Sequence, residues 1–143
     1  MSKLSSLERD QFTTMLIEAS NVIGLELPEE KVETLLQYLE LLLKWNTAFN
    51  LTAIREPKEM LVKHLIDSLS IAPYIEGKNI LDVGTGPGLP GIPMAILFPE
   101  KNFTLVDSNG KKTRFLFQVK TQLKLENVNV YQTRVEKHDS GPI

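Results

Sequence analysis

The feature that most constrains the fold of this chain is a change of hydrophobic period at Gly77. Before it, apolar residues recur every three or four positions, as they do in amphipathic helices. After it, short apolar runs alternate with helix-like segments, and these runs are Asn79–Val83, Phe103–Asp107 and Val128–Gln132. Strands that alternate with helices of this length indicate a parallel sheet made of right-handed βαβ units. The sequence therefore predicts an α/β fold in which helices precede a βαβαβ unit, one half of a doubly wound sheet.

Three helices are predicted before the sheet. The first has Ser5 and Glu8 at capping-box spacing, the second begins at Pro28, and the third begins near Pro57. The segment from Asn46 to Arg55 is expected to be a polar linker, and Trp45 beside it is expected to pack the helices against the sheet. We therefore divide the chain into an N-terminal helical cap, residues 1–75, and a βαβαβ half-domain, residues 76–143.

The first strand is expected at the centre of the complete sheet. Ile80, Leu81 and Val83 are all apolar, which is typical of a parallel strand covered on both faces. In a doubly wound sheet such a strand has neighbours on both sides. The sequence holds strands for one side only, so the sheet is expected to be partial.

Composition excludes several classes of protein. The 143 residues are 42% hydrophobic and 24% charged, which are ordinary globular values, and the formal net charge of −2 gives no signal for nucleic acid. There is no cysteine, which rules out disulfides and thiolate chemistry, and with only two histidines we expect no metal site. No apolar run is long enough for a membrane span and no signal peptide is read, so a cytoplasmic protein is expected.

The most informative motif is a glycine-rich loop that runs from Asp82 to Gly88 in the order DVGTGPG. It lies between the first predicted strand and the next helix, which is where nucleotide-binding loops occur. Asp107 ends the following strand, where a carboxylate can accept hydrogen bonds from both hydroxyls of a ribose. The pattern therefore predicts a site for a ligand that contains a nucleoside.

Three ligands compete for this loop. A phosphate-binding P-loop needs a lysine after its last glycine, but Ile92 follows Gly91. A dinucleotide fingerprint needs a small residue where Leu89 stands. The observed order, G-x-G-x-G with an acid two residues ahead, resembles the S-adenosylmethionine loop of class I methyltransferases. A glycine-rich turn that binds no ligand also remains open.

The resemblance extends beyond the loop. The strings KWNTAFNLTAIREP, KHLIDS, DVGTGPGLPGIP, LVDSNGKKTRFL and RVEK are similar to those of the RsmG (GidB) family of bacterial 16S rRNA methyltransferases, from about residue 25 to residue 137. The resemblance implies a Rossmann-like class I methyltransferase sheet. It also implies methyl transfer from S-adenosylmethionine to N7 of a guanine in the 530 loop of 16S rRNA. Its partner would be 16S rRNA or the small ribosomal subunit, and we expect a full-length monomer that does not bind membranes.

The loop pattern and the resemblance together assign the cofactor site. The resemblance implies Gly84 and Leu89 in the loop, and Val135 and Glu136 beside the adenine. The remaining cofactor-binding residues are assigned from the loop pattern and are Asp82, Gly86, Gly88 and Asp107. The family continues with further strands, one of which carries an arginine of the ligand site, so this chain is expected to be truncated at its C-terminus. Whether the short chain is active stays open.

Methyl transfer to guanine N7 requires little acid–base catalysis by the protein. Guanine N7 has a free lone pair and no proton, so positioning and desolvation are the main requirements. The methylated ring is cationic, and Asp67 is a candidate to stabilise that charge. Asp67 stands three residues from His64, so both share a helical face. The favoured interpretation is that the pair orients the glycine loop, and the catalytic residues stay unassigned.

Basic residues are concentrated in one part of the chain. Residues 101–124 hold six basic residues against one acidic residue, whereas residues 26–40 hold one lysine against five glutamates. This asymmetry predicts an RNA-facing edge that includes Lys111, Lys112 and Arg114; a solvated helix face is the alternative. Other functions also stay open, namely a methyltransferase for tRNA or a small molecule, an NAD-dependent oxidoreductase, and a non-catalytic RNA-binding fragment.

Overall fold

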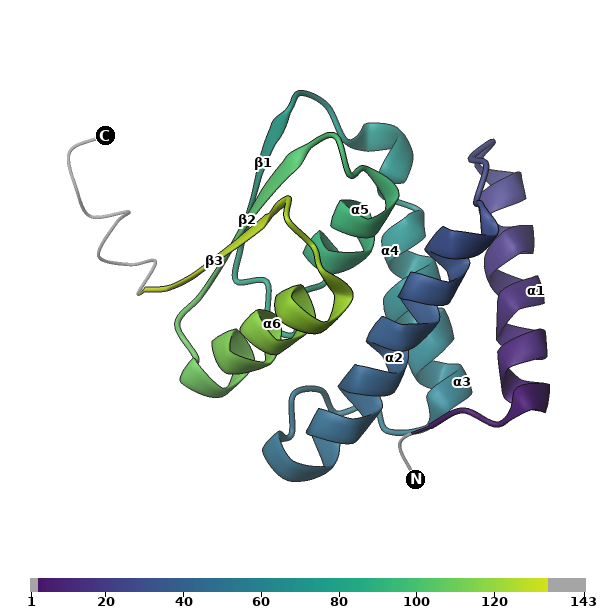
Figure 1. Ribbon diagram of the computed structural model, residues 1–143, viewed down its shortest axis with the longest axis horizontal. Helices are drawn as coiled ribbons and strands as arrows, with labels where there is room; N and C mark the ends of the chain where they lie inside the picture. The colour runs from purple at the N-terminus through teal and green to yellow at the C-terminus, as the bar shows by residue number, and fades with distance from the viewer. Residues whose placement is uncertain (1–2, 134–143) are drawn as a thin grey trace.

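The structure is a computed structural model, and it describes residues 3–133. Helices come first and strands alternate with helices after them (Figure 1). In chain order the elements are α1 (Ser6–Val22), α2 (Glu29–Phe49), α3 (Pro57–Met60), the π-helical turn η1 (Leu61–Ile66), α4 (Asp67–Leu69), the 3-10 turn η2 (Ala72–Tyr74), β1 (Asn79–Val83), α5 (Gly91–Leu97), β2 (Asn102–Asp107), α6 (Gly110–Leu123) and β3 (Val128–Gln132).

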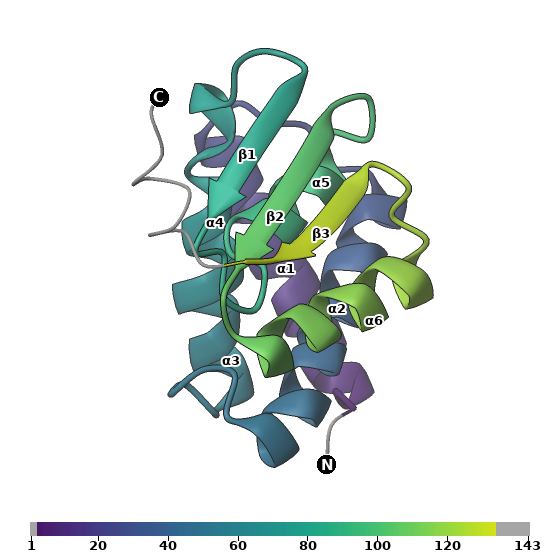
Figure 2. The same cartoon turned by 90° about the vertical axis from the view of Figure 1, so that its left-hand side faces the viewer.

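The three strands form a parallel sheet in the order β1-β2-β3. Ile80 of β1 lies opposite Phe103 of β2, which in turn lies opposite Val128 of β3. The predicted βαβαβ unit is therefore confirmed, because each crossover runs through one helix, α5 and then α6. Figure 2 looks onto one face of this sheet, with α2 and α5 behind it.

The expectation that β1 is covered on both faces is wrong for the part of the chain that the structure describes. Leu81 is 63% exposed and Val83 is 47% exposed. Leu81 and Val83 lie on the same face of the sheet, because side chains alternate along a strand. Their exposure shows that the described helices do not cover that face. The apolar residues of β1 thus predict a strand correctly, but the described helices cover only one face of it. Within the described sheet, β1 is an edge strand.

Helix α2 forms the centre of the fold. Leu35, Leu39 and Leu42 have no exposed surface, and they belong to one hydrophobic cluster with residues of the sheet, of α5 and of α6. Trp45 lies on Phe115 of α6 with ring centroids 5.9 Å apart. The predicted packing role of Trp45 is confirmed, and the helical segment and the sheet share a single core.

Helix boundaries agree with the prediction at α1 and differ at α2. Ser5 and Glu8 form the predicted capping box. Helix α2 continues four residues into the expected linker and ends where Asn50 adopts a left-handed conformation, with φ of 52°. Asn46 is therefore helical, and its side chain accepts a hydrogen bond from Thr52 N at 2.9 Å. No helix within residues 3–133 has the length and apolar character needed to cross a membrane.

Candidate functional site

The glycine loop leaves β1 in a conformation that glycine adopts easily. Gly84 N and Thr85 N both donate to Val106 O of β2, at 2.8 and 3.2 Å. Gly84 has φ of +71°, a left-handed value that disfavours other residues. A Cβ atom at Gly84 would meet nothing within 4 Å. The requirement for glycine at position 84 therefore comes from the backbone angle and not from crowding by the protein.

Gly88 is required for a different reason. Its φ is +101°, and a Cβ atom there would overlap the side chain of Ile92 and lie 2.9 Å from Leu116 Cδ2. Ile92 belongs to α5 and Leu116 to α6. The absence of a side chain at Gly88 thus allows both helices to pack closely against the loop.

Asp82 fastens the loop to the first turn of α5. Its Oδ2 atom accepts hydrogen bonds from Thr85 Oγ1 at 2.8 Å and from Gly91 N at 3.1 Å. Burial raises the pKa of Asp82, the two hydrogen bonds oppose that shift, and the nearby Asp107 carboxylate adds to it. Asp82 therefore stabilises the conformation of the loop by hydrogen bonds to Thr85 and Gly91.

Asp107 holds the opposite side of the loop. It is 8% exposed, and its Oδ2 atom accepts from Gly86 N at 2.8 Å while Oδ1 accepts from Asn109 N at 2.9 Å. The structure thus brings the carboxylate from the end of β2 into contact with the loop, as the spacing predicted. Both oxygens are engaged by backbone amides, and each keeps a further lone pair for a ligand hydroxyl.

A cavity of about 350 Å³ lies between the loop and the helical segment. Asp67 and His64 line one wall of this cavity, and Gly84, Gly86 and Leu89 line the other. The structure therefore brings these predicted residues together around one space. The wall formed by His64 belongs to the π-helical turn η1, which the sequence pattern does not reveal.

His64 is held by the linker and not by the glycine loop. Its Nε2 atom is hydrogen-bonded to Thr52 Oγ1 at 2.8 Å. Burial lowers the pKa of His64, while a backbone contact with Lys63 and the charge of Asp67 partly oppose the shift. Thr52, which the sequence reasoning missed, thus fixes the orientation of this ring.

The predicted RNA-facing residues lie in the first turns of α6. Lys111 and Arg114 are exposed and Lys112 is half-buried. Asn109 begins the helix, since its side chain accepts from Lys111 N at 2.9 Å and from Lys112 N at 3.1 Å. Because α6 begins directly after β2, these cations lie at the same end of the sheet as the glycine loop.

Two other basic residues of the 101–124 run, Lys101 and Lys120, do not extend this surface. Lys120 Nζ donates to the carbonyl oxygens of Leu125 and Val128. Lys101 donates to a carbonyl oxygen, that of Gly77, and its Nζ atom lies 5.8 Å from the centre of the Phe98 ring. Both lysines lie at the opposite end of the sheet, so the run that looks continuous in sequence is divided in space.

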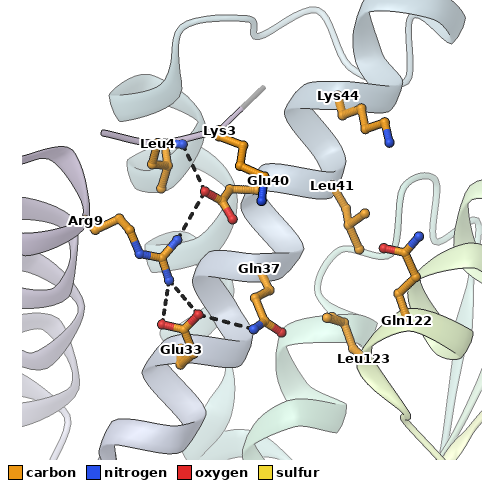
Figure 3. A pocket seen from close by; sticks show the side chains of 10 residues that line it. All are labelled: Lys3, Leu4, Arg9, Glu33, Gln37, Glu40, Leu41, Lys44, Gln122 and Leu123. Carbon is orange, nitrogen blue, oxygen red and sulfur yellow. Dashed lines mark hydrogen bonds and ion pairs between the residues drawn. The ribbon is translucent and has the colours of Figure 1, made fainter. Parts of the chain in front are cut away.

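A larger cavity, of about 560 Å³, lies away from the loop between α1, α2 and α6 (Figure 3). Three of its charged side chains, those of Arg9, Glu33 and Glu40, pair with one another. Arg9 donates to both carboxylate oxygens of Glu33, at 2.5 and 2.6 Å, and lies 3.1 Å from Glu40. Glu40 also accepts from Leu4 N at 2.9 Å. The carboxylates of Glu33 and Glu40 are thus engaged by Arg9 and by the N-terminal segment.

Sequence reasoning missed one residue that touches the loop. Tyr38 of α2 has no exposed surface, and its hydroxyl donates to Pro87 O at 2.8 Å. In the sequence it reads as a core residue on a helical stripe, and only its hydroxyl hints at a polar partner. Val135 and Glu136, predicted beside the adenine, lie outside the described residues.

Comparison with known proteins identifies relatives. The family model described as "GidB: rRNA small subunit methyltransferase G" matches residues 31–142. Proteins named ribosomal RNA small subunit methyltransferase G are similar to this chain. The one from Ectopseudomonas mendocina is 58% identical over 125 residues, which are 86% of this chain and 58% of that protein. The one from Alteromonas mediterranea is 52% identical over 131 residues, which are 92% of this chain and 62% of that protein.

The chain spans about three fifths of the length of these curated relatives. A solved structure of coclaurine N-methyltransferase, bound to N-methylheliamine and SAH, aligns with a TM-score of 0.48 at 16% identity. That alignment covers 95% of this chain and 42% of the other. The similarity is below the level that assigns a fold.

Proposed function

The chain belongs to the rRNA small subunit methyltransferase G family, and from this premise we propose that it acts in methyl transfer from S-adenosylmethionine to N7 of a guanine in the 530 loop of 16S rRNA. The proposed substrate is 16S rRNA or the small ribosomal subunit. We further propose a cytoplasmic protein, monomeric at full length. In it, residues 1–75 form a helical cap and residues 76–143 form the cofactor-binding half of a methyltransferase domain.

One observation about α5 carries the choice of ligand. A dinucleotide places its pyrophosphate on free N–H groups at the start of such a helix. Here Gly91 N donates to Asp82 and Ile92 N donates to Gly88 O at 2.7 Å. Pro90 and Pro93 have no N–H at all. The helix start therefore has no donors left for a pyrophosphate, which disfavours the alternative of an NAD-dependent oxidoreductase.

The charge of the loop fits a sulfonium ligand. Asp82 and Asp107 flank it, and the sequence from residue 82 to residue 91 contains no basic side chain. A loop with acidic and no basic side chains suits S-adenosylmethionine, because this ligand carries a positively charged sulfur and no phosphate. The residues proposed to bind this cofactor are Asp82, Gly84, Gly86, Gly88, Leu89, Asp107, Val135 and Glu136.

The protein's contribution to the proposed reaction is mainly positioning. When bound, the cofactor supplies an electrophilic methyl group, and guanine N7 can attack it without losing a proton. Asp107 is proposed to accept hydrogen bonds from the ribose hydroxyls. Asp67 is exposed and lines the same cavity as Gly84, and we propose that its carboxylate stabilises the positive charge that develops on the guanine.

Contacts with the RNA backbone are proposed for Lys111, Lys112 and Arg114. They lie at the end of the sheet where Asp107 meets the loop, so phosphates bound there would bring the RNA close to the cofactor. Each phosphate contact adds to the salt dependence of RNA binding.

The test is to map methylated guanines in RNA from cells that contain the protein and from cells that lack it. The proposal expects 7-methylguanine in the 530 loop of 16S rRNA in the first sample only. Methylation that is unchanged in the 530 loop would contradict it. A loss confined to tRNA would support the alternative of a tRNA methyltransferase instead.

A further inference from the structure

The contact between Tyr38 and Pro87 joins the helical segment to the glycine loop. The two residues are 49 positions apart, and the phenolic hydroxyl donates to the carbonyl oxygen at 2.8 Å. Pro87 stands between Gly86 and Gly88, a position that we term the loop crest. Within residues 3–133, no other side chain of the N-terminal helices hydrogen-bonds to residues 84–89. This bond therefore links the crest to a part of the fold outside the βαβαβ unit.

The rest of the loop is held from within that unit. Gly84 N donates to Val106 O, and Gly86 N donates to Asp107. Gly88 N and Leu89 N share Thr85 O as acceptor, both at 3.1 Å. These bonds fix the two sides of the loop. The Pro87 carbonyl is left to an outside donor, and Tyr38 supplies it.

Helix α2 also holds the far end of α5. Lys31 Nζ donates to Leu97 O, the last residue of α5, at 2.8 Å. Helix α5 has only seven residues, and Pro90 gives it no side-chain cap. A helix this short is not stable without tertiary contacts. Two side chains of α2 thus hold this segment: Tyr38 contacts the loop before α5, and Lys31 contacts the last residue of α5.

The Tyr38 side chain is packed inside the hydrophobic core. It has no exposed surface, and its ring centroid lies 6.3 Å from that of Phe115. Burial, with a contribution from the Asp82 carboxylate, raises the pKa of Tyr38. The hydroxyl therefore remains a donor in a fixed direction at physiological pH.

We infer that Tyr38 is a positioning residue for cofactor binding, because its hydroxyl holds the loop crest in the conformation that accepts the nucleoside. The identity of that ligand rests on the proposed function. Without the hydroxyl, the loop would populate other conformations, and only the competent fraction would bind. If one tenth of the molecules remain competent, the apparent affinity falls tenfold.

The test compares Tyr38→Phe with Ser20→Ala. The first variant keeps the ring and removes the hydroxyl. Ser20 is a matched control, because it is also fully buried and its hydroxyl donates to a carbonyl, that of Ile17 at 2.8 Å, in the distant helix α1. Titration with S-adenosylhomocysteine, well below the melting temperature, is expected to show about tenfold weaker binding for Tyr38→Phe. Ser20→Ala is expected to bind within about twofold of the unaltered chain.

A second measurement needs no ligand. Hydrogen exchange at the amides of Gly88 and Leu89 is expected to be faster in Tyr38→Phe and unchanged in Ser20→Ala. Failure of the unaltered chain to bind S-adenosylhomocysteine would count against the proposed function and not against Tyr38, whose role the exchange rates would then decide. The inference is overturned by unchanged exchange in Tyr38→Phe, by affinity within twofold of the unaltered chain, or by an equal loss of affinity in both variants. A purely structural role would lower melting temperatures without this difference in affinity.

Discussion

Replacing Asp107 by asparagine tests the loop geometry most sharply. The carboxylate accepts from two backbone amides, Gly86 N at 2.8 Å and Asn109 N at 2.9 Å, and the residue is 8% exposed. An asparagine side chain has the same shape but only one acceptor oxygen, so its NH₂ group must face one of the two donors. The variant therefore loses one charge-assisted hydrogen bond and leaves a buried N–H unsatisfied. We expect the free energy of unfolding to fall by about 2–3 kcal/mol.

Denaturant unfolding of Asp107→Asn beside Asp10→Asn provides the measurement. Asp10 is exposed on α1, so its replacement changes charge equally and is expected to alter stability by less than about 0.5 kcal/mol. Affinity for S-adenosylhomocysteine should also fall at least tenfold in Asp107→Asn, or about 1.4 kcal/mol, because the ribose would lose part of its acceptor. If Asp107→Asn were as stable as Asp10→Asn, the two amide contacts would not exist in solution and the reasoning would fail.

Three further predictions concern the loop, the cationic residues and His64. Gly84→Val should abolish binding of S-adenosylhomocysteine in calorimetry while circular dichroism shows the helices intact, since φ of +71° disfavours a β-branched residue; unchanged affinity would remove Gly84 from the site. Combined replacement of Lys111, Lys112 and Arg114 by alanine should weaken RNA binding and reduce its log–log salt slope by about one per lost phosphate contact, with cofactor affinity intact. Burial lowers the pKa of His64 in the folded chain, so the unfolded chain binds the proton more tightly. The free energy of unfolding should therefore fall as the pH drops below about 6.5, and His64→Gln should flatten that part of the profile.

Local patterns predicted the sheet well. Asn79–Val83 and Val128–Gln132 were predicted with the observed ends, and β2 begins one residue earlier than expected, at Asn102. Such short apolar runs between turn residues leave few alternatives to a strand. Burial of β1 could not be predicted in the same way, because exposure depends on which elements cover a face. Leu81 and Val83 are apolar in either case.

The proximity of the Gly-rich loop and Asp107 was also predictable from the sequence. The residues that hold the candidate site in place from outside were not. The Gly-rich turn and Asp107 follow from chain topology, since parallel strands bring their carboxyl ends together. Tyr38, by contrast, reaches the loop from 49 residues away, and nothing in its neighbourhood marks that partner. Thr52 is hydrogen-bonded to His64, which lies in the π-helical turn η1, and that turn has no recognised sequence signal.

Charge runs proved to be a weak guide to surfaces. Lys120 and Lys101 counted toward the predicted cationic edge, yet both hydrogen-bond to carbonyl oxygens at the other end of the sheet. A long, flexible lysine side chain can satisfy the free carbonyls at the end of a helix or strand. Its charge in the sequence therefore says little about which surface it serves.

The most direct test of the central claim is a paired titration with S-adenosylhomocysteine and NAD, followed by NMR at backbone amides. We expect one-to-one binding of S-adenosylhomocysteine with shifts centred on Gly84 and Gly86, and no binding of NAD. Binding of NAD, or shifts centred on Arg9 and Glu33 in the larger cavity, would contradict the assignment of the glycine loop as a methyltransferase cofactor site.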